Sequence, residues 1–128
     1  MHYTPSTIPA KNVRPGMALL NGVNFRIVED VHPSKTGKTV SITYVEGGKR
    51  TKKRYDVEAT LFIDDEIINV IIFDRESKRA GATQCDDCCA RENYEYYLQY
   101  LGTEYTRVTW ERSTNGGHTW DMIARKEV

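Results

Sequence analysis

Basic side chains are concentrated between residues 35 and 54, where the only acidic residue is Glu46. The seven basic residues are Lys35, Lys38, Lys49, Arg50, Lys52, Lys53 and Arg54. Such groups bind phosphates and release counterions, which gives salt-sensitive binding to nucleic acid of any sequence. Tyr44 and Tyr55 would add stacking faces if they pointed outward. Three interpretations stay open: contact with nucleic acid, contact with an acidic protein surface, or a lysine-rich edge strand that resists aggregation.

The segment His32–Thr39, HPSKTGKT, ends like an ATP-binding phosphate loop. That motif requires a glycine where this sequence has His32, and a helix directly after the threonine, so that helix amides meet the phosphates. The following residues, Val40–Val45, alternate in polarity as a strand does. We therefore predict a polar turn between two strands and no nucleotide site.

Three cysteines stand close together at Cys85, Cys88 and Cys89. The first two have the spacing of half a zinc site, to which a further ligand such as His118 or His32 would have to come from far along the chain. They also flank a predicted helix start, where the helix dipole lowers a thiol pKa and favours a reactive pair. The simplest interpretation is structural thiols, with Cys88 or Cys89 packed under the helix and no cofactor. Zinc and thiol chemistry stay as alternatives.

The segment Ser113–Trp120, STNGGHTW, resembles the Asp-box, with Asn115 in the position of the aspartate. In sialidases and other proteins this motif is a hairpin brace away from the catalytic centre, so the resemblance implies a structural role. We expect its polar side chains to bond the turn amides, and Trp120, with Trp110 across the strands, to anchor the hairpin. No paired acid and nucleophile and no nucleophile elbow accompany it, so we predict no enzymatic activity.

Short strands separated by turns occupy the first part of the chain. Hairpin turns are predicted at Asn21-Gly22 and Gly47-Gly48, because these residues adopt positive φ readily. Residues 61–63 and 67–73 read as a third strand-turn-strand unit around the polar residues 64–66. Strands this short and this closely spaced are typical of a small antiparallel barrel.

The last third of the chain changes period. Tyr94, Tyr97, Leu98 and Leu101 recur at helical spacing before Gly102, which predicts one helix over about residues 86–101. Strands around residues 115–117 then predict a C-terminal β-hairpin. Residues 75–84 are polar and rich in small side chains, which predicts a mobile loop or a boundary.

A family resemblance covers roughly residues 9–60. The run from Pro15-Gly16 through Asn21-Gly22 and residues 25–29 to residues 34–38 resembles the first domain of elongation factor P and its hypusine-bearing eukaryotic and archaeal relatives. In that family an SH3-like barrel carries a modified lysine at a hairpin tip, which reaches the peptidyl-transfer centre of the ribosome. The resemblance implies an SH3-like barrel and places Lys38 at the modified position. A helix and an aromatic hairpin stand where the family has its second, oligonucleotide-binding-type barrel.

Together these patterns predict a mainly β protein with a single domain over residues 1–128. The SH3-like antiparallel barrel would span about residues 9–73, and the helix and hairpin extension about residues 85–126. The 128 residues carry 18 basic and 18 acidic side chains, so the net charge is zero and does not indicate a class of partner. No apolar run approaches the ~20 residues that span a bilayer, and residues 1–16 lack an apolar signal core, so we expect a cytoplasmic protein without a membrane partner.

The predicted function is non-enzymatic binding to nucleic acid or a ribonucleoprotein through the seven basic residues. The first alternative is a protein-interaction module, for example a phage-encoded accessory protein that modulates a host factor through its sheet edges and tyrosine-rich helix. A zinc- or thiol-dependent enzyme is the third. The sequence does not determine the oligomeric state.

Overall fold

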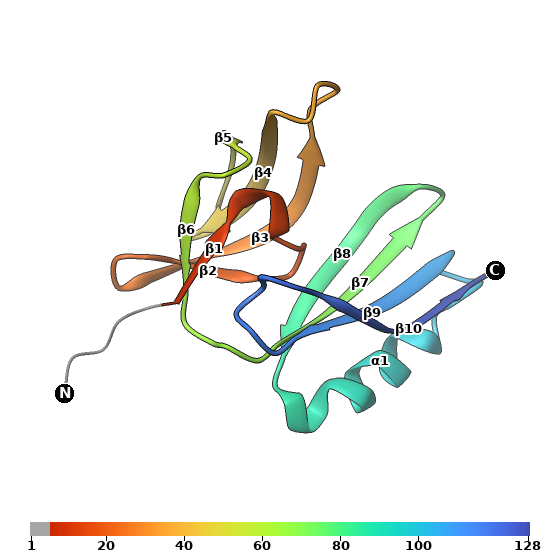
Figure 1. The fold of residues 1–128 in the computed structure, drawn as a ribbon. Coiled ribbons are helices and arrows are strands. Elements are labelled where there is room, and N and C mark those ends of the chain that lie inside the picture. Colours follow the sequence, from red (N-terminus) through yellow and green to blue (C-terminus); the bar gives the residue numbers. More distant parts are fainter. Residues whose placement is uncertain (1–5) are drawn as a thin grey trace.

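The computed structural model describes residues 6–128, which form two antiparallel sheets and one α-helix (Figure 1). The first sheet contains β1 (Ser6–Pro9), β2 (Ala18–Asn21), β3 (Asn24–Pro33), β4 (Thr39–Glu46), β5 (Lys49–Asp56) and β6 (Thr60–Ile63). The second contains β7 (Ile68–Arg75), β8 (Lys78–Cys85), β9 (Arg107–Ser113) and β10 (Asp121–Glu127). The 3-10 helices η1 (Ala10–Asn12) and η2 (Asp87–Cys89) precede β2 and α1 (Ala90–Leu98). A mainly β protein with one α-helix and a C-terminal hairpin is thereby confirmed.

The strand order is β1-β6-β2-β3-β4-β5 in the first sheet and β10-β9-β7-β8 in the second. The three predicted hairpins are confirmed, and they join β2 to β3, β4 to β5 and β9 to β10. The first turn lies one residue later than predicted, at Gly22 and Val23, because Asn21 pairs with Asn24. Gly47 and Gly48 have φ values of 58° and 80°, which residues with a Cβ rarely adopt. This two-residue turn fixes the register in which Glu46 lies opposite Lys49.

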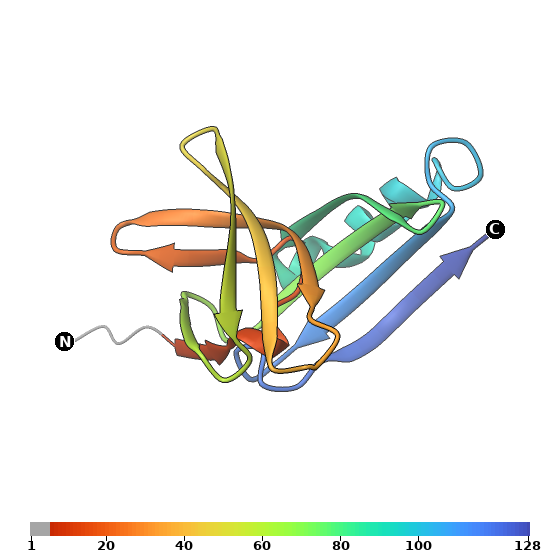
Figure 2. The ribbon, with the colours of Figure 1, turned by 90° about the horizontal axis from the view of Figure 1, so that it is seen from above.

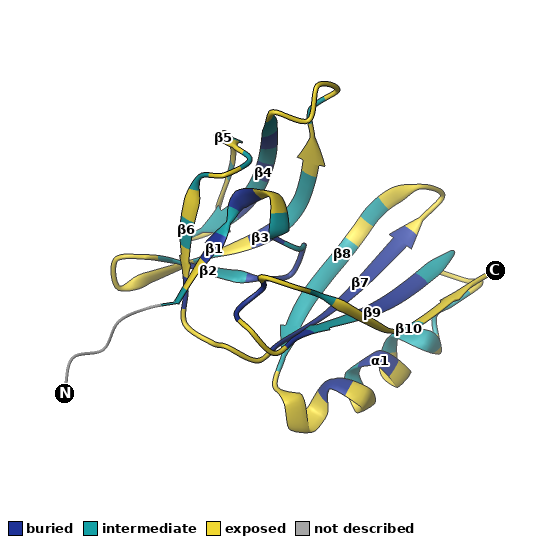
Figure 3. Cartoon of the chain, viewed as in Figure 1, coloured by how far each residue is buried: buried dark blue, intermediate teal, exposed yellow. Residues whose placement is uncertain are grey.

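The predicted third strand-turn-strand unit is wrong, because its two strands lie in different sheets. β6 pairs with β1 and β2, whereas β7 lies between β8 and β9. β7 is buried on both of its faces, as Figure 3 shows, and this explains its continuous apolar sequence. The first sheet therefore ends at Ile63, and β7 belongs to the second sheet.

The loop predicted at residues 75–84 is also wrong, since these residues form the turn into β8 and most of β8 itself. The turn contains no glycine: Glu76 and Ser77 have φ values of 49° and 68°. A small residue is needed at Gly81 because an added Cβ would lie 2.3 Å from Cε2 of Phe73. Small size here reflects packing within the sheet and not mobility.

Two hydrophobic cores lie on opposite faces of the second sheet. One face of β7, with Ile68, Val70 and Ile72, packs against the interior of the first sheet. The other face, with Ile71 and Phe73, packs against α1. The helix therefore lies on the side of the second sheet that points away from the first sheet (Figure 1). None of the helices within residues 6–128 is long and apolar enough to cross a membrane.

The helix is shorter than the predicted range of residues 86–101. Its first turn is the separate 3-10 helix η2, and α1 begins only after Cys89, whose φ and ψ of −119° and 2° interrupt the helix. The predicted apolar face is confirmed, because Tyr94 is buried and the Tyr97 and Phe73 rings stack at 4.3 Å between centroids. The predicted cap at Gly102 is wrong, because α1 ends at Leu98 with Gln99 as its C-cap. Gly102, at a φ of 92°, belongs to the following turn, where its amide donates to the Tyr105 carbonyl oxygen.

Candidate nucleic-acid interface

The edge strand β5 carries five of the seven predicted binding residues. Within residues 6–128 it pairs only with β4, along its whole length, so its other side is open. Its exposed residues are the five cations Lys49, Arg50, Lys52, Lys53 and Arg54 and, at its end, the acidic Asp56. Figure 2 shows that the turn between β4 and β5 projects from the rest of the chain. The structure thus places these five cations on one accessible edge.

Lys35 and Lys38 lie in the exposed turn between β3 and β4, at the far end of the same edge. The backbone of Val57, just after β5, donates a hydrogen bond of 3.2 Å to the carbonyl oxygen of Lys38. This turn leads directly into β4, which confirms the prediction of a polar turn in place of a phosphate loop. Cations therefore follow β5 from the β4–β5 turn to the β3–β4 turn, and we call the seven residues the basic edge.

The cations of β5 alternate between the two faces of the first sheet. Arg50, Lys52 and Arg54 lie opposite Val45, Thr43 and Ser41 on the outer, solvent-facing side. Lys49 and Lys53 share the other side, where Lys53 lies opposite the buried Ile42. The five residues therefore share an edge but not a face. Long side chains from both rows reach the same open edge, because no further strand covers it.

Arg50 is the one member of the basic edge that forms an ion pair among residues 6–128. Its Nε and Nη2 atoms donate to the two carboxylate oxygens of Glu29 at 2.6 and 3.1 Å, and this hydrogen bonding raises the pKa of Arg50. Lys53 Nζ lies 5.2 Å from the centroid of the Tyr55 ring. The other six cations thus have no carboxylate partner within the described chain, and they are available to an external anion.

The two tyrosines predicted to offer stacking faces point toward the core. Tyr44 is 6% exposed and lies beneath Arg26, whose guanidinium carbon is 4.7 Å from the ring centroid. Tyr55 is half-buried and packs against the first core. Both occupy positions whose cross-strand partners face inward, such as Val28 and Val40. The condition under which Tyr44 and Tyr55 would add stacking faces, an outward orientation, is therefore not met.

Two phenylalanines provide the exposed aromatic faces instead. Phe25 and Phe62 are 45% and 48% exposed. Both lie opposite Leu20, so the three side chains form one row across β6, β2 and β3 on the outer face. The next row along the sheet contains Ile27, which is 43% exposed, opposite Val45.

The outer face of the first sheet therefore has an apolar half and a basic half. Val45 joins them, because it lies between Ile27 on β3 and Arg50 on β5. We call the apolar half, formed by Leu20, Phe25, Ile27, Val45 and Phe62, the aromatic row. Its signal in the sequence is the register of the β2–β3 turn, which sets Phe25 opposite Leu20. The sequence pattern hides this arrangement, because Arg26, a charged residue, lies on the inward side of β3.

The cysteines do not form the reactive pair that the helix dipole predicted. Cys85 ends β8, and its burial raises the pKa of its thiol to about 11. The pKa of Cys89 is also raised, first because its thiol is hydrogen-bonded with that of Cys88, at 3.2 Å between the sulfur atoms. Cys88 and Cys89 are exposed, so neither packs under the helix, whereas Cys85 contacts the second core.

His118 lies apart from the cysteines, in the turn between β9 and β10, where its carbonyl oxygen accepts a hydrogen bond from Asn12. Within residues 6–128, no group of three or more histidine, cysteine, aspartate or glutamate side chains is close enough to hold a metal ion. The zinc set of Cys85, Cys88, Cys89 and His118 is therefore not brought together.

The segment Ser113–Trp120 forms the turn of the last hairpin. Ser113 Oγ accepts the Gly117 amide at 2.8 Å, and Asn115 Oδ1 accepts the Thr119 amide at 2.9 Å, as expected for a braced turn. Trp120 donates to the Asn12 carbonyl oxygen on η1, at 2.8 Å. Trp110 faces α1 and lies opposite Ala124, so the predicted pairing of the two tryptophans is wrong.

No protein-family model matches this sequence, and no curated protein matches it in sequence. Among solved structures, a translation initiation factor eIF-5A family protein from Naegleria fowleri aligns at 15% identity and a TM-score of 0.41, covering 95% of this chain and 98% of the other. The eukaryotic translation initiation factor 5A from Methanococcus jannaschii aligns at 9% identity and a TM-score of 0.39, covering 97% and 98%. Both belong to the family that residues 9–60 resemble.

Proposed function

We propose that this protein binds single-stranded nucleic acid, alone or within a ribonucleoprotein, through the basic edge and the aromatic row. The observation that carries the proposal is the group of six exposed cations without a carboxylate partner, beside two half-exposed phenylalanines. Cations along an open edge suit a phosphate backbone, because neutralised phosphates release counterions. The binding needs no enzymatic chemistry.

The aromatic row favours a single strand over a duplex. Bases in a single strand are unstacked, so they can lie on Phe25 and Phe62 while the phosphates follow β5. In a duplex the bases are already stacked on one another, and only the phosphates would be accessible to this face. Stacking on phenylalanine accepts any base, so we expect little sequence preference.

The basic edge can be tested by charge reversal with a matched control. In the double variant Lys52→Glu/Lys53→Glu, affinity for a fluorescently labelled single-stranded oligonucleotide, measured by anisotropy, should fall about tenfold or more. The slope of log K against log salt should shrink by about 1.4, since each lost phosphate contact removes about 0.7. The control Lys78→Glu/Lys126→Glu changes the net charge equally at exposed residues away from β5.

The control should bind as the unmodified protein does, apart from a small effect of net charge. Equal losses in the two double variants would show that only overall charge matters, and this would contradict a site on β5. Absence of salt-dependent binding by the unmodified protein would contradict the proposal as a whole.

A protein partner is the second candidate, because apolar residues are exposed beyond the basic edge. Tyr96 on α1 is 52% exposed, and its ring packs edge-on against Tyr97 and Tyr100 at 5.2 and 5.6 Å between centroids. Exposed tyrosines are common at protein interfaces. A partner that stays bound after nuclease treatment and is lost in Tyr96→Ala, but not in Lys52→Glu/Lys53→Glu, would favour this candidate.

A further inference from the structure

A cavity of about 520 Å³ lies between the two sheets, on the side of the second sheet that faces the first. Its walls come from η1 and the β3–β4 region on one side and from β7, β9 and β10 on the other. The basic edge does not line it, with Lys35, Lys38 and all of β5 outside the cavity. This volume falls within the range of sites that hold small molecules.

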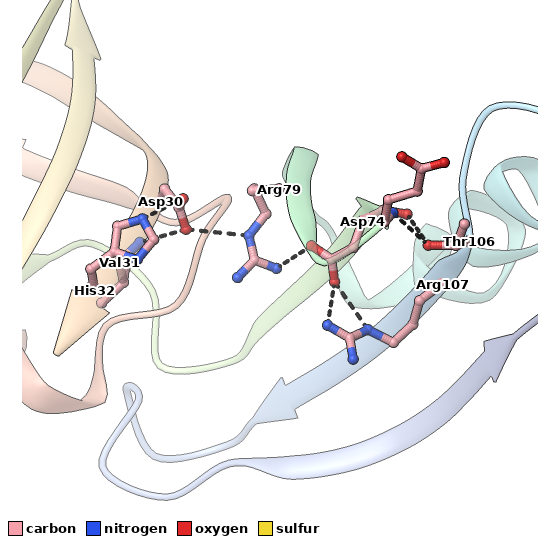
Figure 4. A network of polar contacts seen from close by, with 8 residues as sticks. Asp30, Val31, His32, Asp74, Arg79, Thr106 and Arg107 are labelled. Carbon is pink, nitrogen blue, oxygen red and sulfur yellow. Dashed lines mark hydrogen bonds and ion pairs between the residues drawn. The ribbon is translucent and has the colours of Figure 1, made fainter.

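Asp74 and two arginines form the polar end of this cavity (Figure 4). Asp74 is 4% exposed and accepts a hydrogen bond from Arg79 Nη1 at 2.8 Å. Its other oxygen accepts from Arg107 Nε at 3.1 Å and Nη2 at 2.9 Å. A buried carboxylate held by three charge-assisted hydrogen bonds fixes the two guanidinium groups in place.

The arginines keep donors that Asp74 does not use. Each guanidinium has five N–H groups, and Figure 4 shows one terminal nitrogen of each arginine pointing away from Asp74. Arg79 Nε also lies 3.4 Å from Oδ1 of Asp30, and the other carboxylate oxygen of Asp30 lies 2.8 Å from Nε2 of His32. Two carboxylates, Asp74 and the more distant Asp30, thus face the two guanidinium groups, and the free terminal nitrogen of each arginine remains available to an anionic ligand.

The remainder of the lining has eight apolar residues, Val13, Pro15, Val31, Pro33, Val40, Val57, Ile72 and Met122. Arg14 and Glu111 add an ion pair of 2.9 Å between them. Two more cations stand in the lining with weak partners. Lys11 pairs with Glu58 across two exposed side chains, and Arg125 lies 3.9 Å from Glu127. Exposed pairs of this kind contribute little and exchange readily with other anions. An apolar chamber with fixed guanidinium groups at one end suits a ligand with an apolar body and an anionic head.

We propose that this cavity binds a small organic anion, with its carboxylate or phosphate head on Arg79 and Arg107 and its apolar body between the two sheets. The site is separate from the proposed nucleic-acid interface, because the two share no residues. Asp74 is a positioning residue here: it holds the two arginines and does not touch the ligand.

The test uses the full chain and four probes: phenyl phosphate, benzoate, inorganic phosphate and benzyl alcohol. Binding is followed by amide chemical shifts in a titration of isotope-labelled protein. Phenyl phosphate or benzoate should saturate, with shifts centred on residues 72–74 and 107–109, and the tighter of the two identifies the preferred head group. Inorganic phosphate and benzyl alcohol should each bind at least about tenfold more weakly, because each lacks one half of the ligand.

Two variants keep the test decisive. Arg107→Ala should weaken the better probe by about tenfold or more, since a hydrogen bond to a charged group is lost. If that variant does not fold, Val57→Trp decides, because the half-buried Val57 lines the cavity without touching the ion network, and a larger side chain there would fill it. Val23→Trp is the matched control, at a residue that is 94% exposed. Lys52→Glu/Lys53→Glu should leave probe binding unchanged.

The proposal is overturned if neither aromatic anion saturates at concentrations up to about 10 mM, which corresponds to affinity weaker than that of ordinary small-molecule sites. It is also overturned if benzyl alcohol binds as tightly as the anions, or if Val57→Trp binds the better probe as tightly as the Val23→Trp control.

Discussion

Basic residues are concentrated in two regions of this protein, one exposed to solvent along β5 and the other between the two sheets. Along β5 they are mostly lysines, exposed and without carboxylate partners. Between the two sheets they are mostly arginines, and Arg14, Arg79 and Arg107 each bond a carboxylate. An unpaired charge is costly to bury but nearly free in water, so pairing is required only between the sheets. The proposed nucleic-acid interface therefore rests on exposure and on the absence of an internal partner, and not on cation density alone.

The two regions also differ in the geometry that they require. Asp74 is bonded by Arg79 from β8 and Arg107 from β9, so one carboxylate ties together three strands of the second sheet. Planar guanidinium groups with several donors suit this arrangement, whereas a flexible lysine on an open edge can adjust to a passing phosphate. Arg50, the arginine of β5 that pairs with Glu29, is intermediate between the two cases.

The largest expected effect comes from breaking the paired region. Asp74→Asn should lower the free energy of unfolding by about 3–5 kcal/mol, because two half-buried guanidinium groups lose their shared anion. Urea unfolding measures this loss. Glu95→Gln, on the exposed side of α1, is the control and should change the free energy by less than about 0.5 kcal/mol.

Oligonucleotide affinity measured on folded Asp74→Asn should match that of the unmodified protein, because Asp74 is not part of the basic edge. A stability loss near that of the control would mean that the ion network contributes little, and the contrast between the two regions would disappear.

A second experiment sharpens the description of the exposed region. Phe25→Ala and Phe62→Ala should each weaken binding of a single-stranded oligonucleotide by about 1–3 kcal/mol, the range for one base stacked on an aromatic ring. Anisotropy at several salt concentrations should show an unchanged salt slope, because no phosphate contact is lost. Val23→Ala, next to the same turn and 94% exposed, should have no effect on binding. A changed slope in the phenylalanine variants would argue against stacking.

The smallest effect is expected at a half-exposed ion pair, Arg112 with Asp87. Hydrogen bonds from Arg112 and then Asn69 lower the pKa of Asp87 to about 2, from an ordinary value of 3.8. A lowered pKa means that the pair stabilises the folded state above about pH 3.8, and that this contribution is lost as pH falls toward 2. The difference between the urea midpoints of Asp87→Asn and the unmodified protein should therefore narrow as the pH falls from about 5 toward 2. A constant difference over this range would contradict the assignment.

Much of the fold follows from local patterns. The turns at Gly22 and Gly47-Gly48 were predictable because glycine adopts their positive φ values readily, and the helical face at Tyr94 and Tyr97 because its spacing is regular. β8 was not predictable in the same way, since its turn uses Glu76 and Ser77 at positive φ without glycine. Nor does the sequence show that β6 and β7 separate into different sheets, because that depends on long-range pairing.

The candidate interface was predictable only in part. The cations of β5 stand out as a charge run, but the side to which each points depends on its partner in β4. Tyr44 is an aromatic residue that could stack on a base, but its position in β4 places its side chain in the core. Phe25 and Phe62 lie far apart in the sequence and meet only through Leu20. The triad of Arg79, Asp74 and Arg107 likewise needs three strands in register.

The most direct measurement of the central claim is a map of amide chemical-shift changes when a single-stranded oligonucleotide is added to isotope-labelled protein. The account predicts that the changes concentrate on residues 49–54, on the β3–β4 turn and around Phe25 and Phe62, and that they diminish as salt is raised. Changes confined to the second sheet and α1, with β5 unaffected, would contradict it.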